Sequence, residues 1–377
     1  MKFAHAHVEV SSIANDVSLE PGLPVFGDAI TGLIAMLLAI LFLYGAYKFF
    51  DSYIKGKPKP LEVQIGLGKV AVGLIIASVM SAALDIWWHR AVGRETIFVP
   101  PHLLMYFFVS AAIFTCIYGW YTYRHKVWKR CTFFLIVLLA SAPFDNYWHI
   151  LFGVENLSRP VSLSWAPPHM MLDIGAMGAL LSLIPLFLHE HKLTTRTFFL
   201  DLIFATLLAM LSFLVMPFHP TEGWGAVLGF CGAGVLTLVY VGVLAFAQKL
   251  MRGEYNSIRI TLYFIVLVLV GFGKETAPGI VLLPHDRPPV WIFIFSFVAL
   301  AVFMDILKHI PLWLRGALAG VVWAAITFGL ERYFFAPEFY FGNNAVMVAV
   351  VSSLFGGTIG GYIGLRTGEK IRNNIKT

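Results

Sequence analysis

About eleven runs of roughly twenty mostly apolar residues follow one another along this chain. A helix that spans a membrane needs about 20 such residues, because the hydrocarbon core is about 30 Å thick. Hydrophobic residues make up 59% of the 377 residues and charged residues only 13%, a composition that excludes an ordinary soluble enzyme. We therefore predict an all-α polytopic membrane protein. The predicted spans lie near residues 26–50, 63–88, 101–122, 131–150, 167–188, 197–217, 225–248, 258–283, 289–307, 311–334 and 344–365.

The domain organisation predicted from this pattern is simple. A single transmembrane helical domain covers residues 26–377, after an outer N-terminal segment over residues 1–25. The polar stretches between the apolar runs are too short to bury a core of their own. The first ten residues, MKFAHAHVEV, lack the basic-then-apolar order of a cleavable signal, so we expect the first span to be retained.

Basic residues fall in every second loop, for example Lys57 after the first span, Lys129 after the third and Lys370 after the last. Lysine and arginine favour cytoplasmic loops, so this alternation predicts an N-terminus outside the cell and a cytoplasmic C-terminus. We expect an integral protein of a bacterial or archaeal plasma membrane, in contact with the lipid bilayer. Nucleic acid is not an expected partner, because the excess positive charge lies mostly in these short loops.

Two segments sixty positions apart carry nearly the same sequence. Residues 81–89 read SAALDIWWH and are followed by Pro-Pro-His at 100–102, whereas residues 141–149 read SAPFDNYWH and are followed by Pro-Pro-His at 167–169. In each copy, an Asp and a His four positions apart share one face at the end of a helix, and a second His opens the next helix. Proline suits such a helix start, where its missing N–H has no intrahelical partner.

We interpret this repetition as an internal duplication of a helical hairpin, near residues 63–122 and 131–188. The predicted orientation places both sets of ionisable residues at the outer ends of their helices. A charged side chain at membrane depth costs about 2.5–3.5 kcal/mol, so a duplicated set indicates a function. The predicted metal ligands are Asp85, His89, His102, Asp145, His149 and His169.

Two imidazoles and one carboxylate suit copper, iron or zinc, and leave coordination positions open for a small molecule. Copper is the metal we expect, with iron or zinc as alternatives. Asp173 lies one turn after His169, and Glu95 and Glu155 lie in the loops, so these three carboxylates are candidates for further ligands or for orienting the ligands. The alternative is that the Asp and His residues only hydrogen-bond each other in a wet vestibule. The spacing leaves open one dinuclear site or two mononuclear sites.

The run Asp85-x3-His89-x12-His102, with Arg94-Glu95-Thr96 between its histidines, resembles a metal-binding segment in the membrane region of the particulate methane and ammonia monooxygenases, the copper membrane monooxygenase family. The resemblance covers about twenty residues of this chain. It implies that Asp85, His89 and His102 bind copper within the membrane region. The second copy repeats the Asp-x3-His part, whereas its last His departs from the spacing.

Three functions are compatible with these features. The first is a copper-dependent membrane oxidoreductase, similar to a monooxygenase, that oxidises a small apolar substrate at the outer face. The second is a transition-metal carrier or an assembly factor for a membrane oxidase. The third is a membrane cytochrome that binds haem through paired histidines, which the carboxylates beside the histidines disfavour. The sequence does not identify catalytic residues.

A glycine ladder runs along the last predicted span, where Gly356, Gly360 and Gly364 recur every four residues. Such a ladder lets two helices approach closely. The helix packed there belongs either to the same chain or to a second copy of it, and other membrane proteins are further candidate partners.

The three cysteines, Cys116, Cys131 and Cys231, lie in apolar segments without CxxC spacing. We therefore expect buried, inert thiols, with neither a disulfide framework nor a thiolate metal site. Asp201 and Asp305 lie near the inner ends of their spans, where we expect water to solvate both carboxylates.

Overall fold

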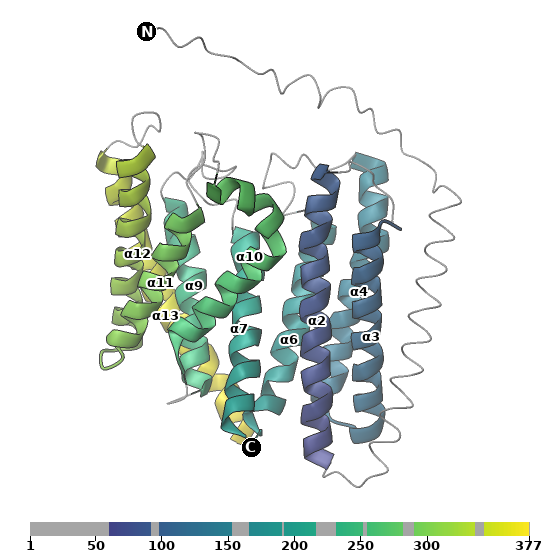
Figure 1. Cartoon of the computed structure of the whole chain (residues 1–377). Helices are drawn as coiled ribbons and strands as arrows, with labels where there is room; N and C mark the ends of the chain where they lie inside the picture. The colour runs from purple at the N-terminus through teal and green to yellow at the C-terminus, as the bar shows by residue number, and fades with distance from the viewer. Residues whose placement is uncertain are drawn as a thin grey trace.

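The computed structural model describes residues 60–91, 98–152, 166–190, 192–215, 231–251, 255–281, 290–335 and 343–376. This part of the chain is all α-helical, as predicted (Figure 1). The predicted N-terminal segment and the first predicted span lie outside it. The ten helices are α2 (Pro60–Ala91), α3 (Pro100–Tyr123), α4 (Lys126–Phe152), α6 (Pro167–Leu188), α7 (Leu193–Val215), α9 (Gly232–Met251), α10 (Ser257–Val281), α11 (Val290–Ile306), α12 (Leu312–Phe335) and α13 (Asn343–Lys376).

Each helix coincides with one of the predicted spans that begin at residue 63 or later. Eight helices, all except α10 and α11, are long and apolar enough to cross a membrane. The apolar stretches found within those two, Ser257–Val270 and Ile294–Ile306, are shorter. The described part of the chain therefore has the helices of a polytopic integral membrane protein.

Large apolar side chains on the outer surface fit the same interpretation. Phe114, Phe133 and Phe355 are 54%, 60% and 59% exposed, and they belong to three different helices. A soluble protein rarely exposes apolar surface on this scale, because each such side chain disturbs water. In a bilayer these side chains contact lipid chains instead.

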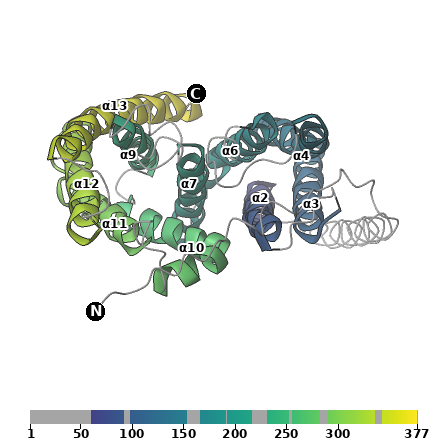
Figure 2. The same ribbon diagram turned by 90° about the horizontal axis from the view of Figure 1, so that it is seen from above.

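The helices form two groups, visible from above in Figure 2. In the first group, α2 packs on α3, α3 on α4, α4 on α6, and α6 back on α2. In the second, contacts run around a closed ring of six helices, from α7 through α9, α13, α12, α11 and α10 back to α7. The two predicted copies of the hairpin, α2 with α3 and α4 with α6, therefore make up the whole first group.

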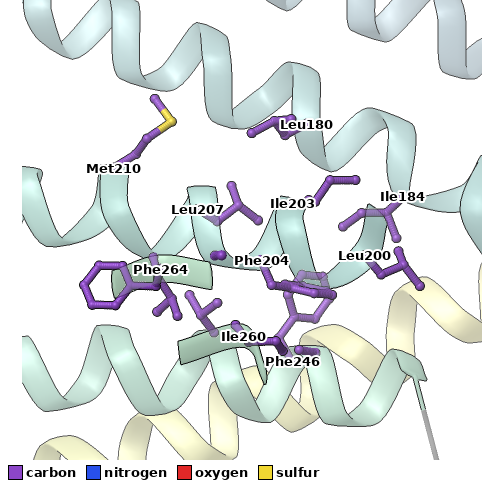
Figure 3. Packing of buried hydrophobic residues seen from close by; sticks show 14 of the residues in the cluster. Leu180, Ile184, Leu200, Ile203, Phe204, Leu207, Met210, Phe246, Ile260 and Phe264 are labelled. Carbon is purple, nitrogen blue, oxygen red and sulfur yellow. The ribbon is translucent and has the colours of Figure 1, made fainter. Parts of the chain in front are cut away.

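Helix α7 joins the two groups through a continuous apolar core. Ile203 and Phe204 are fully buried, and Figure 3 shows side chains of α7 between those of α6 on one side and those of α9 and α10 on the other. The Phe204 ring meets Phe246 of α9 edge to face, with 5.5 Å between the ring centroids. This core fixes the position of the hairpin group against the rest of the protein.

The glycine ladder of α13 packs against α9 of the same chain. A Cβ atom added at Gly356 or at Gly360 would collide with the backbone carbonyl oxygen of Gly234 or Leu238, respectively. Gly364 stands in the same way against Gly242. The first of the two alternatives, packing within the chain, is therefore confirmed. An oligomer contact through these three glycines would require α9 to leave its place.

Replacing Gly360 by alanine is expected to destabilise the protein by about 1–3 kcal/mol, because a methyl group must be inserted between two helix backbones. Thermal unfolding in detergent, followed by tryptophan fluorescence, measures the loss. The matched control is Gly329→Ala in α12, where an added Cβ has no described atom within 4 Å. Equal unfolding midpoints for the two variants would contradict the close α9 to α13 contact.

Two of the cysteines form a pair that the sequence did not predict. Cys116 of α3 and Cys131 of α4 are fully buried, with their Sγ atoms 3.3 Å apart. Cys231, in contrast, is exposed, so the prediction of a buried thiol is wrong there. It precedes the first full turn of α9 instead of lying inside a packed span.

Mild oxidation with diamide is expected to link Cys116 to Cys131, because a disulfide needs the sulfur atoms only about 1.3 Å closer than they lie in the structure. Each bond formed transfers two hydrogens from the two thiols to diamide. Mass spectrometry of peptides from the oxidised protein identifies the link, and Cys116→Ser serves as the control. Crosslinks from Cys231 to either partner, with none between Cys116 and Cys131, would contradict the packing of α3 on α4.

Candidate metal site in the twin hairpins

The candidate ligands lie where α2 and α4 end and where α3 and α6 begin, at the same end of the bundle (Figure 1). Asp85 lies in the last two turns of α2, and Asp145 takes the same place in α4. His102 and His169 each follow two prolines in the first turn of the next helix. The helix bounds alone therefore bring a carboxylate and an imidazole to one level in each hairpin.

In the first hairpin these two side chains are in contact. The Nε2 atom of His102 lies 3.0 Å from Oδ2 of Asp85, a distance at which an N–H group donates to the carboxylate. The side chains are 12% and 19% exposed, respectively, so the contact is largely shielded. The carboxylate also orients the imidazole ring, as carboxylates do beside metal-binding histidines.

The second hairpin repeats the contact. His169 Nε2 lies 3.4 Å from Asp145 Oδ1, and these side chains are 24% and 20% exposed. The same two residue types, on corresponding helices, thus meet in both copies. This agreement supports the duplication beyond the likeness of the two sequences.

One turn deeper, the two copies differ. Asp173 of α6 is buried at 5% exposure, and its Oδ2 atom has no hydrogen-bond partner within the described part of the chain. It interacts electrostatically with His169, which shares its helix face. Tyr106 takes the corresponding position in α3, with its ring centroid 6.0 Å from that of His102.

The remaining predicted ligands have no described side chain. The backbones of His89 and His149 belong to α2 and α4, but their side chains lie outside the described part, as do Glu95 and Glu155 entirely. Among the side chains that the structure does describe, no three His, Cys, Asp or Glu residues gather into a group that could hold a metal ion. Each hairpin therefore presents two described donors of the three that we predict.

A second polar cluster, which the sequence did not reveal, lies in the six-helix ring. Asp201 of α7 is 1% exposed, and its Oδ2 accepts a hydrogen bond from Nε of Arg259 at 2.6 Å. Asp305 accepts hydrogen bonds from the backbone N–H groups of Ser257 and Ile258, at the first turn of α10. The prediction that water solvates Asp201 is wrong, because α10 supplies an arginine to it. Asp305 is half-buried and caps a helix.

Arg315 of α12 completes this cluster. It is 3% exposed, and its guanidinium donates to Gln248 Oε1 at 2.9 Å and to the carbonyl oxygens of Met304, Lys308 and Ile310 at 3.1, 3.2 and 3.3 Å. Those carbonyl groups lie at and just beyond the end of α11, where a helix leaves carbonyls without partners. A single arginine thus joins α9, α11 and α12. The sequence signal was weak, because an arginine that begins a span is usually assigned to a loop.

The fold and the site together define a class of protein: a polytopic helical membrane protein in which duplicated hairpins form the same Asp–His contact twice. No protein-family model, curated protein or solved structure matches the chain. The resemblance to the copper membrane monooxygenases therefore rests on the segment from Asp85 to His102.

Proposed function

We propose that this protein binds a transition-metal ion, copper by preference, at each of its two hairpins. The single observation that carries the proposal is the Asp–His contact formed in the same way by both copies, at 3.0 and 3.4 Å. A carboxylate and an imidazole held together, away from most of the solvent, are ligands that copper, iron and zinc share. His89 and His149, each one turn after its aspartate, would supply the third ligand.

The proposed orientation places both sites at the outer face of the membrane. It follows from eleven spans, a first span over residues 26–50, an outer N-terminus and a cytoplasmic C-terminus. Basic residues in alternate loops support it, because lysine and arginine are retained on the cytoplasmic side. Reporter fusions after Lys57 and after the last residue would both be active in the cytoplasm if this orientation holds.

The activity we propose is the oxidation of a small apolar substrate with oxygen, similar to that of the copper membrane monooxygenases. Three protein ligands leave coordination positions open, and a bound copper ion would supply the redox chemistry there. Val99 and Met105, both buried, lie within a turn of His102 and make the surroundings apolar. Other membrane proteins are proposed partners of this chain. A carrier of transition metals is the alternative.

The proposal is tested by elemental analysis of the purified protein, which is expected to contain a transition metal. Protein that holds no metal, and takes up none from buffered copper, iron or zinc, would end the proposal and its alternative together. Oxygen-dependent turnover of small apolar compounds by reconstituted protein, measured beside metal uptake into the same vesicles, separates an oxidoreductase from a carrier.

A further inference from the structure

The two hairpins form one closed bundle, so their candidate sites are neighbours. Helix α3 of the first hairpin packs on α4 of the second, and α2 packs on α6. Both Asp–His contacts lie at the same end of this bundle. Two like sites at one level of a four-helix bundle raise the question of which side chains lie between them.

Tyr106 is the described side chain that reaches both. It lies on α3, one turn after His102, and the two rings are tilted by 36° with 6.0 Å between their centroids. The ring is partly buried against the core. Its hydroxyl group interacts electrostatically with Asp85 of its own hairpin and with Asp145 of the other. A residue of the first copy is thus close to the carboxylates of both.

The second copy carries a different group at the corresponding position. There Asp173 stands one turn after His169 and interacts with that histidine. A phenol donates one hydrogen bond, whereas an ionised carboxylate only accepts. The duplicated positions have therefore diverged, and the phenol of the first copy is the donor available to either aspartate.

We propose that the two metal sites share one interior and that Tyr106 is a positioning residue for both, holding the carboxylates of Asp85 and Asp145. This inference rests on the proposed function, because it concerns how the two bound ions are placed. It selects a pair of interacting ions over two independent ones. Its consequences are a magnetic interaction between the ions and a response of both sites to a change at one tyrosine.

Cu(II) is the probe for the first consequence. Protein loaded with two Cu(II) ions is expected to show dipolar broadening or splitting in its electron paramagnetic resonance spectrum. Asp85→Ala and Asp145→Ala, each holding one ion, are expected to lose it. Two ions without any dipolar interaction would overturn the inference and leave the proposed function intact, whereas a protein without bound copper would overturn the proposed function itself.

The second consequence is tested with Tyr106→Phe, which removes the hydroxyl group and keeps the ring. Both Cu(II) signals are expected to shift, and the two variants that each lack one site show which signal belongs to which hairpin. Tyr121→Phe is the matched control, since that tyrosine lies on the same helix at 72% exposure and far from His102 along it. A shift confined to the site of Asp85 would overturn the role of Tyr106 in the second site.

Discussion

Replacing Asp85 and Asp145 together by alanine is expected to remove both bound metal ions, and replacing either one alone is expected to remove about half of the metal. Each aspartate is one of the two described donors of its hairpin, and its partner histidine loses the carboxylate that orients it. Loss of such a ligand or orienting group weakens metal affinity by about 10–100-fold or more. Elemental analysis after dialysis against buffered copper measures the content.

The control for this experiment is Glu62→Ala, which removes an exposed carboxylate from the first turn of α2, the same helix that carries Asp85 near its other end. Exposed His309 serves in the same way for a His102→Ala variant. Full metal content in the double aspartate variant would show that the Asp–His contacts are hydrogen bonds of structural value only.

Replacing Arg315 by alanine is expected to destabilise the protein by about 3–5 kcal/mol, the range for breaking a buried charged network. Four hydrogen bonds disappear, and three carbonyl groups near the end of α11 lose their donor inside the packed protein. Burial also raises the pKa of the neighbouring Tyr255, whose hydroxyl therefore stays neutral and cannot compensate. Thermal unfolding in detergent is expected to begin roughly 5–10 °C earlier.

Arg315→Lys and Arg130→Ala complete the series. Lysine keeps the charge but lacks the planar fork that reaches several carbonyls at once, so an intermediate loss is expected. Arg130 lies exposed on α4, and its removal is expected to leave the midpoint nearly unchanged. An unaltered midpoint for Arg315→Ala would mean that the α9, α11 and α12 ends are held by apolar packing alone.

Much of this arrangement was predictable because depth in a membrane follows from position along a hairpin. Two residues equally far from a tight turn lie at one level of adjacent antiparallel helices. Cys116 and Cys131 lie eight residues before and seven residues after Arg124, and they meet. The same reasoning, applied to the loops after α2 and α4, placed His102 beside Asp85 and His169 beside Asp145.

Rotation about the helix axes was not predictable in this way. The described spans are apolar almost all round, so their sequences do not mark which face packs inward. Asp201 shows the consequence, since its position near a span end suggested contact with water, whereas α10 covers it with Arg259. Gly360 shows it again, because only the packed structure decides that α9 and not a second chain fills the groove.

The chain alone therefore determined that the protein is helical, where each described helix runs and at which level its ionisable residues lie, because run length and hydropathy are properties of a segment by itself. The tertiary structure decided which helices are neighbours, and it brought Tyr106 within reach of Asp145 and Arg315 to the end of α11. Those outcomes depend on contacts between residues far apart in sequence, which no single segment encodes.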